Sequence, residues 1–384
     1  MSFILKKNYF LLTIYFVYIA IGSYLSISNG ITADEYHEQQ NWQINLEAAI
    51  NFIKYGSYEE LLNYGDKYHG IGFHLISQPI QLILHNFVSN LNDISAFGGL
   101  LISKHFVVFL SFSISGIFFY LLCLKLTRNL GFSFISSALY LLYPYLFGHA
   151  LFNPKDVPFL SFWLINSYIS LTIIESMFYE NKIKISKIIV LSFLTAFLIS
   201  IRVLGLVIFL QYIISVVVLF NIKKIDINNF IKKNLSTFFV FIIFLFLFIF
   251  ILNPILWHNP LELLNSINWM SKYFNDVCTL TLGTCMRSLN LPSSYYFIWL
   301  FFKLPIIVLI GILLFPFVEK KIFSEKPVCI YYVTLLLSFF LILFIFILKN
   351  VAVYDELRHV LFLVPIIFLI GLTNLFYFNK KFFY

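Results

Sequence analysis

The length of the apolar blocks constrains this chain more than any other feature. The blocks run for roughly 17–25 residues, which is the length that a helix needs to cross about 30 Å of hydrocarbon. Of the 384 residues, 60% are apolar and only 11% are charged, whereas a soluble domain carries about 25% charged residues. This composition excludes an ordinary soluble domain and a disordered chain. It predicts an all-α integral membrane protein.

Ten blocks can form membrane spans if the 33-residue stretch 188–220 is a hairpin of two short helices. The ten predicted spans are 8–28, 100–124, 132–148, 158–178, 188–201, 203–220, 235–254, 295–316, 330–348 and 359–378. A single long helix over 188–220 would place the basic cluster 223–233 on the opposite side of the membrane, against the positive-inside bias. The charge pattern therefore favours the hairpin.

With the hairpin, 16 of the 26 basic residues and only five acidic residues fall on the side of the two termini. These basic residues are Lys6, Lys7, Lys125, Arg128, Lys182, Lys184, Lys187, Lys223, Lys224, Lys232, Lys233, Lys320, Lys321, Lys326, Lys380 and Lys381, and the acidic ones are Glu175, Glu180, Asp226, Glu319 and Glu325. Basic loops stay in the cytoplasm, so both termini are predicted to be cytoplasmic. The positive charge marks topology, and it does not form a basic face interleaved with aromatics, so no nucleic-acid partner is expected.

The chain is predicted to be a single polytopic membrane domain over 1–384, with two long outer segments, 29–99 and 255–294. Thr32 and Glu35 have the spacing of a capping box, so a helix should begin near Ala33 and end before Gly56. Ser57 and Glu60 repeat that spacing. We therefore expect two amphipathic helices that lie flat on the outer membrane surface.

Cys278 and Cys285 lie in the second outer segment with six residues between them. A compartment outside the cytoplasm is oxidising, so a disulfide between them is predicted.

Ionisable residues cluster where the predicted spans meet the outer surface, and such residues are costly and often functional. Four groups stand out: Asp34, Glu35 and His37 after the first span; His149, Lys155 and Asp156 in the turn before the fourth; Arg202 at the hairpin tip; and Tyr354, Arg358 and His359 before the last span. Each group has a plain structural alternative. The acids at 34 and 35 suit a helix N-terminus, Asp156 can cap a helix that begins near Pro158, and Arg358 can pair with Asp355 or Glu356.

Together these groups place acids and phosphate-competent cations at one membrane surface. A buried arginine needs an anionic partner, and guanidinium groups bind phosphate in bidentate geometry. A carboxylate can accept the proton of an attacking hydroxyl, and a phosphate leaving group gains charge that a guanidinium stabilises. A lipid phosphate is therefore the expected substrate. No glycine-rich nucleotide loop is found in the sequence, as this chemistry allows.

These motifs resemble those of the polytopic GT-C glycosyltransferases. The resemblance rests on the outer Asp-Glu pair at 34–35, the Asn-Pro-Lys-Asp at 153–156, the arginine at 202 and the Tyr-Asp-x-x-Arg-His at 354–359. Within that superfamily the chain is similar to the bacterial relatives of protein O-mannosyltransferases and of the aminoarabinose and lipopolysaccharide glycosyltransferases. Unlike some of those relatives, the chain is not expected to carry a large C-terminal soluble domain.

The resemblance implies an inverting glycosyltransferase in the bacterial inner membrane, with its active site facing the periplasm. The enzyme would move a sugar from a polyprenyl-phosphate donor to a hydroxyl of a glycan, lipid or protein acceptor. The implied roles are catalytic for Asp34, Glu35 and Asp156, with Asp34 the general base; phosphate-binding for Arg202, Arg358, Lys155 and His359; and substrate-binding for His37, Tyr354 and His149. The resemblance does not imply that the enzyme requires a cofactor or metal. A Mg²⁺ or Mn²⁺ ion between Asp34 and Asp156 is nevertheless compatible with the chemistry.

Two other classes of function share this topology. A transporter or flippase of lipid-linked sugars would also carry intramembrane arginine, but it should show polar groups along a path through the spans and internal repeats. A membrane scaffold would not need cations at the outer surface. The sequence favours the transferase because its charged motifs gather at one surface.

Overall fold

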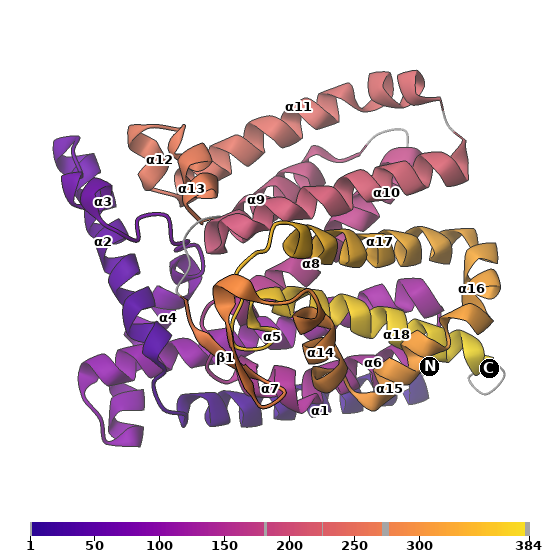
Figure 1. Cartoon of the computed structure of the whole chain (residues 1–384), viewed down its shortest axis with the longest axis horizontal. Helices are drawn as coiled ribbons and strands as arrows, with labels where there is room; N and C mark the ends of the chain where they lie inside the picture. The colour runs from indigo at the N-terminus through magenta and orange to yellow at the C-terminus, as the bar shows by residue number, and fades with distance from the viewer. Residues whose placement is uncertain (1, 180–182, 225, 271–275, 381–384) are drawn as a thin grey trace.

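A computed structural model describes residues 2–179, 183–224, 226–270 and 276–380 of the chain (Figure 1). The first half contains α1 (Ser2–Ile27), α2 (Ala33–Tyr55), α3 (Glu59–Asn63), α4 (His74–Asn92), α5 (Ala96–Thr127), α6 (Leu130–Leu142), α7 (Pro144–Ala150), α8 (Asp156–Tyr179) and α9 (Ile185–Ile201). The second half contains η1 (Val203–Val207), α10 (Ile208–Lys223), α11 (Ile227–Leu252), α12 (Ile255–His258), α13 (Glu262–Met270), β1 (Cys278–Thr281), β2 (Thr284–Arg287), η2 (Ser288–Asn290), α14 (Ser294–Lys303), α15 (Ile306–Leu313), α16 (Phe315–Ser324), α17 (Lys326–Leu348), η3 (Arg358–Leu363) and α18 (Val364–Phe378).

The structure confirms a helical integral membrane protein. Among the described residues, six helical segments are long and apolar enough to cross a membrane, namely α5, α8, η1 with α10, α11, α17, and η3 with α18. A seventh is reached if the bent pair α6 and α7 counts as one span. The apolar part of α1, Leu11–Ile27, and α9 are shorter. Helix is present at all ten predicted positions, but six or seven spans are supported by length and composition.

Proline explains two places where a predicted single span is broken. The predicted span 132–148 is divided into α6 and α7, which meet at an angle of 60° just before Pro144. The predicted span 295–316 is divided into α14 and α15, with Leu304 and Pro305 in extended conformation between them. The residue before a proline is pushed out of the helical region, and proline has no backbone N–H to donate. Both single-helix predictions were therefore wrong at these points.

The long helices form a bundle in which both termini lie at one end (Figure 1). The segments α2, α3, α12 and α13 lie at the other end, and α2 runs steeply across it. α5 packs against α1, α4, α6 and α8, while α15 packs against α18. α18 is almost completely buried, whereas most of α11 faces outward. The predicted topology places Glu180, Lys182 and Lys381 in the inner connections and residues 271–275 in the second outer segment. All of these lie outside the described residues.

Close backbone contact between α15 and α18 depends on two glycines. A Cβ atom placed on Gly311 would lie 2.0 Å from the carbonyl oxygen of Gly371. Any side chain there would force the helices apart, so the pair fixes how near α15 approaches the buried helix.

The first outer segment begins as predicted. Thr32 and Glu35 form the capping box of α2, and Gly56 ends that helix in the left-handed conformation, with φ of 70°. Within α2, Leu46, Ile50 and Ile53 are exposed, which suits contact with lipid. The second signal does not form a capping box: Tyr58 is the N-cap of α3, no side chain caps it, and the helix has only five residues. The next long helix begins at His74 rather than after Ser57.

The second outer segment contains a small antiparallel hairpin that the sequence did not predict. β1 pairs with β2, and Cys278 and Cys285 form a disulfide across it, with their Cα atoms 5.4 Å apart. The predicted pairing is confirmed.

We expect this disulfide to be present in protein purified without reductant. Neither Cys278 nor Cys285 should react with an alkylating reagent until the bond is reduced, and mass spectrometry of the tryptic peptides checks this. By the loop-entropy estimate the bond contributes about 2–3 kcal/mol to the free energy of unfolding. Alkylation of both thiols in unreduced, folded protein would contradict the assignment. The free cysteine Cys329 is partly accessible and serves as the internal control for the reaction.

Candidate functional site

Four charged side chains that are far apart in sequence meet at the end of the bundle crossed by α2. Asp34 lies in the first turn of α2, Asp156 begins α8, Arg202 follows α9, and Arg358 begins η3. Arg358 donates from Nε to an oxygen of Asp156 at 2.7 Å and pairs through another nitrogen with Asp34. Arg202 pairs with the other oxygen of Asp156. We call Asp34, Asp156, Arg202 and Arg358 the charged cluster.

Asp156 is the buried centre of the charged cluster. Its side chain is 4% exposed, and each of its oxygens pairs with a guanidinium group. Asn153 accepts a hydrogen bond from the backbone N–H of Asp156 at 2.9 Å and donates one to its carboxylate at 3.1 Å. Since every oxygen of Asp156 is engaged, this carboxylate is suited to hold the two arginines in place. It is poorly placed to accept a proton from a substrate.

Asp34 is the exposed carboxylate of the charged cluster. Its side chain is 47% exposed and its recorded partner is Arg358. Arg358 also contacts Asp355 at 3.3 Å, and the side chain of Asp355 is 59% exposed. Arg358 therefore stands between one buried and two exposed carboxylates, and an incoming anion can replace an exposed one without disturbing Asp156.

Arg202 owes its position to a break between two helices. Its backbone is extended, with φ of −150°, where α9 ends and η1 begins. The loop before α4 packs directly onto the last turn of α9: Gly72 donates its N–H to the carbonyl of Ser200 at 2.9 Å. A Cβ atom on Gly70 would lie 2.3 Å from the carbonyl oxygen of Ile201. The two glycines thus let the first outer segment lie against the turn that carries Arg202.

Glu35 is buried and occupied in holding the start of α2. One oxygen accepts from the backbone N–H and the hydroxyl of Thr32, both at 2.8 Å. The other lies 2.9 Å from Nε2 of His105, and the Nδ1 of His105 is 3.0 Å from the carbonyl of Ser26. These contacts join α1, α2 and α5, and they give Glu35 a structural task beside Asp34.

Lys155 is paired inside the protein rather than left open to an anion. Its Nζ lies 2.6 Å from Oε1 of Glu38, and both side chains are largely buried. Burial favours the neutral form of Glu38, but the ammonium groups of Lys155 and Lys104 outweigh it and lower the pKa of this carboxyl below its usual value. Lys104 itself is buried against Nε2 of His74 at 2.8 Å. The sequence did not identify Glu38, Lys104 or His74 as parts of a connected network.

The remaining predicted residues divide between the charged cluster and its surroundings. His359 is next to Arg358, its ring centroid is 4.4 Å from that of Tyr354, and its buried Nε2 has no hydrogen-bond partner among the described residues. His149 contacts Asn153, which holds Asp156, at 3.4 Å. His37 points elsewhere: its Nε2 lies 3.2 Å from Asp66. The structure thus brings His359 and Tyr354 to the cluster, and places His149 behind it.

The partner group of His37 was missed by sequence reasoning. Asp66 and His69 come from the turn after α3, and Nδ1 of His69 lies 3.6 Å from Oδ1 of Asp66. Burial and the charge of Lys155 lower the pKa of His69 to about 4, so its imidazole is neutral at pH 7. The spacing Asp66-x-x-His69 was visible in the sequence, but nothing in it located His37 nearby. Asp34 and Asp156, between which a divalent ion is compatible with the proposed chemistry but not required, are both paired with Arg358.

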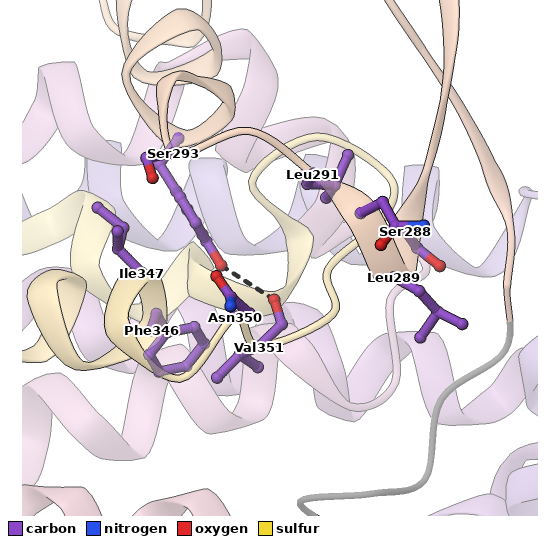
Figure 2. Close-up of a pocket in the computed structure, with 10 residues that line it drawn as sticks. Ser288, Leu289, Leu291, Ser293, Phe346, Ile347, Asn350 and Val351 are labelled. Carbon is purple, nitrogen blue, oxygen red and sulfur yellow. Dashed lines mark hydrogen bonds between the residues drawn. The ribbon is translucent and has the colours of Figure 1, made fainter.

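A cavity of about 250 Å³ lies beside the hairpin segment, and no residue of the charged cluster lines it (Figure 2). Ser288, Leu289 and Leu291 line one side, and Phe346 and Ile347 line the other. Tyr296 and Val351 also line the cavity, and the Tyr296 hydroxyl donates to the carbonyl of Val351 at 3.2 Å. None of the ten lining residues carries a charge, so the cavity does not suit a phosphate group.

No known protein family matches this chain, and no curated protein has a similar sequence. What the site can do must therefore be inferred from its own residues.

Proposed function

We propose that this protein is an inverting glycosyltransferase of the GT-C type, which uses a polyprenyl-phosphate-linked sugar as donor. The observation that carries the proposal is the charged cluster: two guanidinium groups share one buried carboxylate, and an exposed carboxylate lies on the same guanidinium. A buried charge is retained only where it is compensated. A phosphate at Arg358 would be met by two fixed cations, with a carboxylate close by to receive a proton.

The reaction follows from these positions. The acceptor hydroxyl attacks the anomeric carbon and gives its proton to the carboxylate of Asp34. A bond forms between the acceptor oxygen and the anomeric carbon, the bond from that carbon to the phosphate oxygen breaks, and its electron pair leaves with polyprenyl phosphate. Arg358 and Arg202 stabilise the charge gained by the phosphate. The buried Nε2 of His359 is available as a further contact.

Donor binding also has a consequence for the base. In the structure Arg358 is paired with Asp34. A phosphate that takes the place of Asp34 on Arg358 releases this carboxylate for the acceptor. Asp156 keeps both arginines in position throughout because it is buried between them. The exposed carboxylate is thus the proposed base, and the buried one positions the phosphate-binding groups.

A flippase for lipid-linked sugars is the alternative. It needs polar groups along a route through the spans. Lys104 and Asp156 are buried in the parts of α5 and α8 nearest the charged cluster, whereas Glu175 is partly exposed near the other end of α8. Between these positions α5 has no Asp, Glu, Lys or Arg from 105 to 124, and α8 has none from 157 to 174. This distribution favours chemistry at one surface.

Transfer of labelled sugar tests the proposal. Purified protein in lipid nanodiscs is incubated with polyprenyl-phosphate mannose, glucose or aminoarabinose, each labelled in the sugar, together with a membrane glycan, lipid and protein extract as acceptor. One donor should lose its label to acceptor while an equal amount of polyprenyl phosphate appears. If the folded protein cleaves none of these donors, the proposal is wrong.

We also propose ten spans with both termini in the cytoplasm and the charged cluster on the periplasmic face of the bacterial inner membrane. Support comes from the positions of the termini at one end of the bundle and of α2, α12 and α13 at the other (Figure 1). Single cysteines at the exposed positions Asn63 and Leu264 should be labelled from outside intact spheroplasts, and one at Asn229 should be labelled only after lysis. Labelling of Asn229 in intact cells would overturn the orientation.

A further inference from the structure

We propose that His37, Asp66 and His69 form a zinc site that joins α2 to the turn after α3. The inference does not depend on the glycosyltransferase proposal. It begins from donor chemistry: two imidazoles and one carboxylate are ligands that zinc takes in proteins. One ligand comes from α2 and two come from the turn, so the set is formed only by the fold.

The donor atoms of the three side chains lie close enough together to reach one metal ion. Zinc holds nitrogen and oxygen ligands at about 2.0–2.2 Å, so neighbouring ligand atoms lie roughly 3.3–3.5 Å apart. Nε2 of His37 is 3.2 Å from Asp66, and Nδ1 of His69 is 3.6 Å from Asp66. One donor atom from each residue can be chosen so that all three lie within 4.8 Å of one another. Nδ1 of His69 also lies 3.3 Å from the backbone carbonyl of Asp66, so this ring would have to turn from that carbonyl to bring the three donors around one ion.

The surroundings favour a cation and hold the ligands in place. The charge of the nearby Lys155 is partly offset by Glu38, whose Oε1 lies 2.6 Å from its Nζ. Lys67 points away and donates to the carbonyl of Leu62 at 2.8 Å. The rings of His37 and His69 meet edge to face, and the ring of Trp269 also meets His69 edge to face.

The position gives the site a consequence for α2. His37 is three residues after Asp34, on the same helix. The turn that carries Asp66 and His69 leads directly into Gly70 and Gly72, which pack on the end of α9 beside Arg202. A zinc ion here would fasten the start of α2 to that turn. All three side chains are partly exposed, so an ion can reach them from solvent.

Metal content tests the site. Tag-free protein in detergent is equilibrated with Zn²⁺, dialysed, and measured by inductively coupled plasma mass spectrometry. Wild type should hold one zinc per chain, whereas Asp66→Asn and His69→Gln should each hold less than a tenth. The control is His85→Gln on α4, because the His85 ring contacts the carbonyl of Leu82 outside the proposed zinc site. This variant should hold as much zinc as wild type. Wild type without zinc, or full zinc in Asp66→Asn, would overturn the site.

A second measurement covers the case in which the variants do not fold. Stripped wild-type protein is titrated with Zn²⁺ or Mg²⁺ while its melting temperature is followed. A ligand that binds only the folded state raises the melting temperature, so Zn²⁺ should raise it and Mg²⁺ should not. No response to Zn²⁺, or an equal response to both ions, would rule out a zinc site.

Discussion

Asp34→Asn should lower sugar transfer by roughly two to four orders of magnitude, because a positioned general base contributes a factor of that size. The amide has nearly the same shape and can still accept a hydrogen bond from Arg358, so donor binding should survive. Turnover and donor affinity are measured separately, by single-turnover transfer and by equilibrium binding of labelled donor. A loss confined to turnover identifies a group that acts in the transition state.

Glu35→Gln is the matched control for the base. Glu35 is adjacent in sequence but buried, with its oxygens on Thr32 and His105. The amide keeps an acceptor for Thr32, so transfer by folded Glu35→Gln should stay within about tenfold of wild type, far above Asp34→Asn. The opposite ranking would give the base role to Glu35. Near-normal transfer by folded Asp34→Asn would contradict the proposed mechanism.

Asp156→Asn should lower the free energy of unfolding by about 3–5 kcal/mol. The change leaves Arg202 and Arg358 without the buried carboxylate they share, and an uncompensated buried charge costs that much. Unfolding of the detergent-solubilised protein by a denaturing detergent, followed by circular dichroism, provides the measurement. Transfer should also fall, since the two guanidinium groups lose their fixed positions.

Asp355→Asn is the control for Asp156. Asp355 contacts the same arginine at 3.3 Å but is 59% exposed, and exposed ion pairs contribute about 0–1 kcal/mol. Its loss should be small. Adding Arg202→Gln to Asp156→Asn removes one of the stranded cations, so the double variant should be less destabilised than the sum of the two single changes. Equal effects of Asp156→Asn and Asp355→Asn would contradict the assigned role of Asp156.

Local signals in the sequence were enough to predict the start of the first outer helix and the disulfide. Thr32 and Glu35 are three residues apart, and their reciprocal contacts form within one turn. Cys278 and Cys285 lie on two strands joined by a tight turn. In both cases the interacting residues are close in the chain, so their spacing in the sequence was enough to predict the contact between them.

The convergence of the charged cluster was predicted from membrane topology rather than from contacts. Placing Asp34, Asp156, Arg202 and Arg358 on one face required only the alternation of spans and the positive-inside bias. Topology did not show which acid would be buried. The different exposure of Asp34 and Asp156 depends on how α8, α9 and η3 pack, and this distinction separates the proposed base from the group that holds the arginines.

Other features were not predicted because they depend on places where the chain folds back on itself. No local sequence pattern indicates these places. His37 meets Asp66 and His69 only because the segment after α3 folds back along α2. Lys104 and His74 meet between α4 and α5 inside the protein. Proline disfavours an unbroken helix, so the breaks before Pro144 and around Pro305 could have been predicted. They were not, because each apolar block is long enough to be interpreted as one span.

The fate of the donor lipid in sealed proteoliposomes tests the central claim most directly. Polyprenyl-phosphate sugar, labelled separately in its lipid and in its sugar, is placed in vesicles with purified protein and acceptor extract. The account predicts that sugar label moves to acceptor while an equal amount of free polyprenyl phosphate accumulates, and that Asp34→Asn slows both by roughly two to four orders of magnitude. Intact donor that crosses the bilayer with both labels still joined, at a rate that Asp34→Asn leaves unchanged, would contradict it.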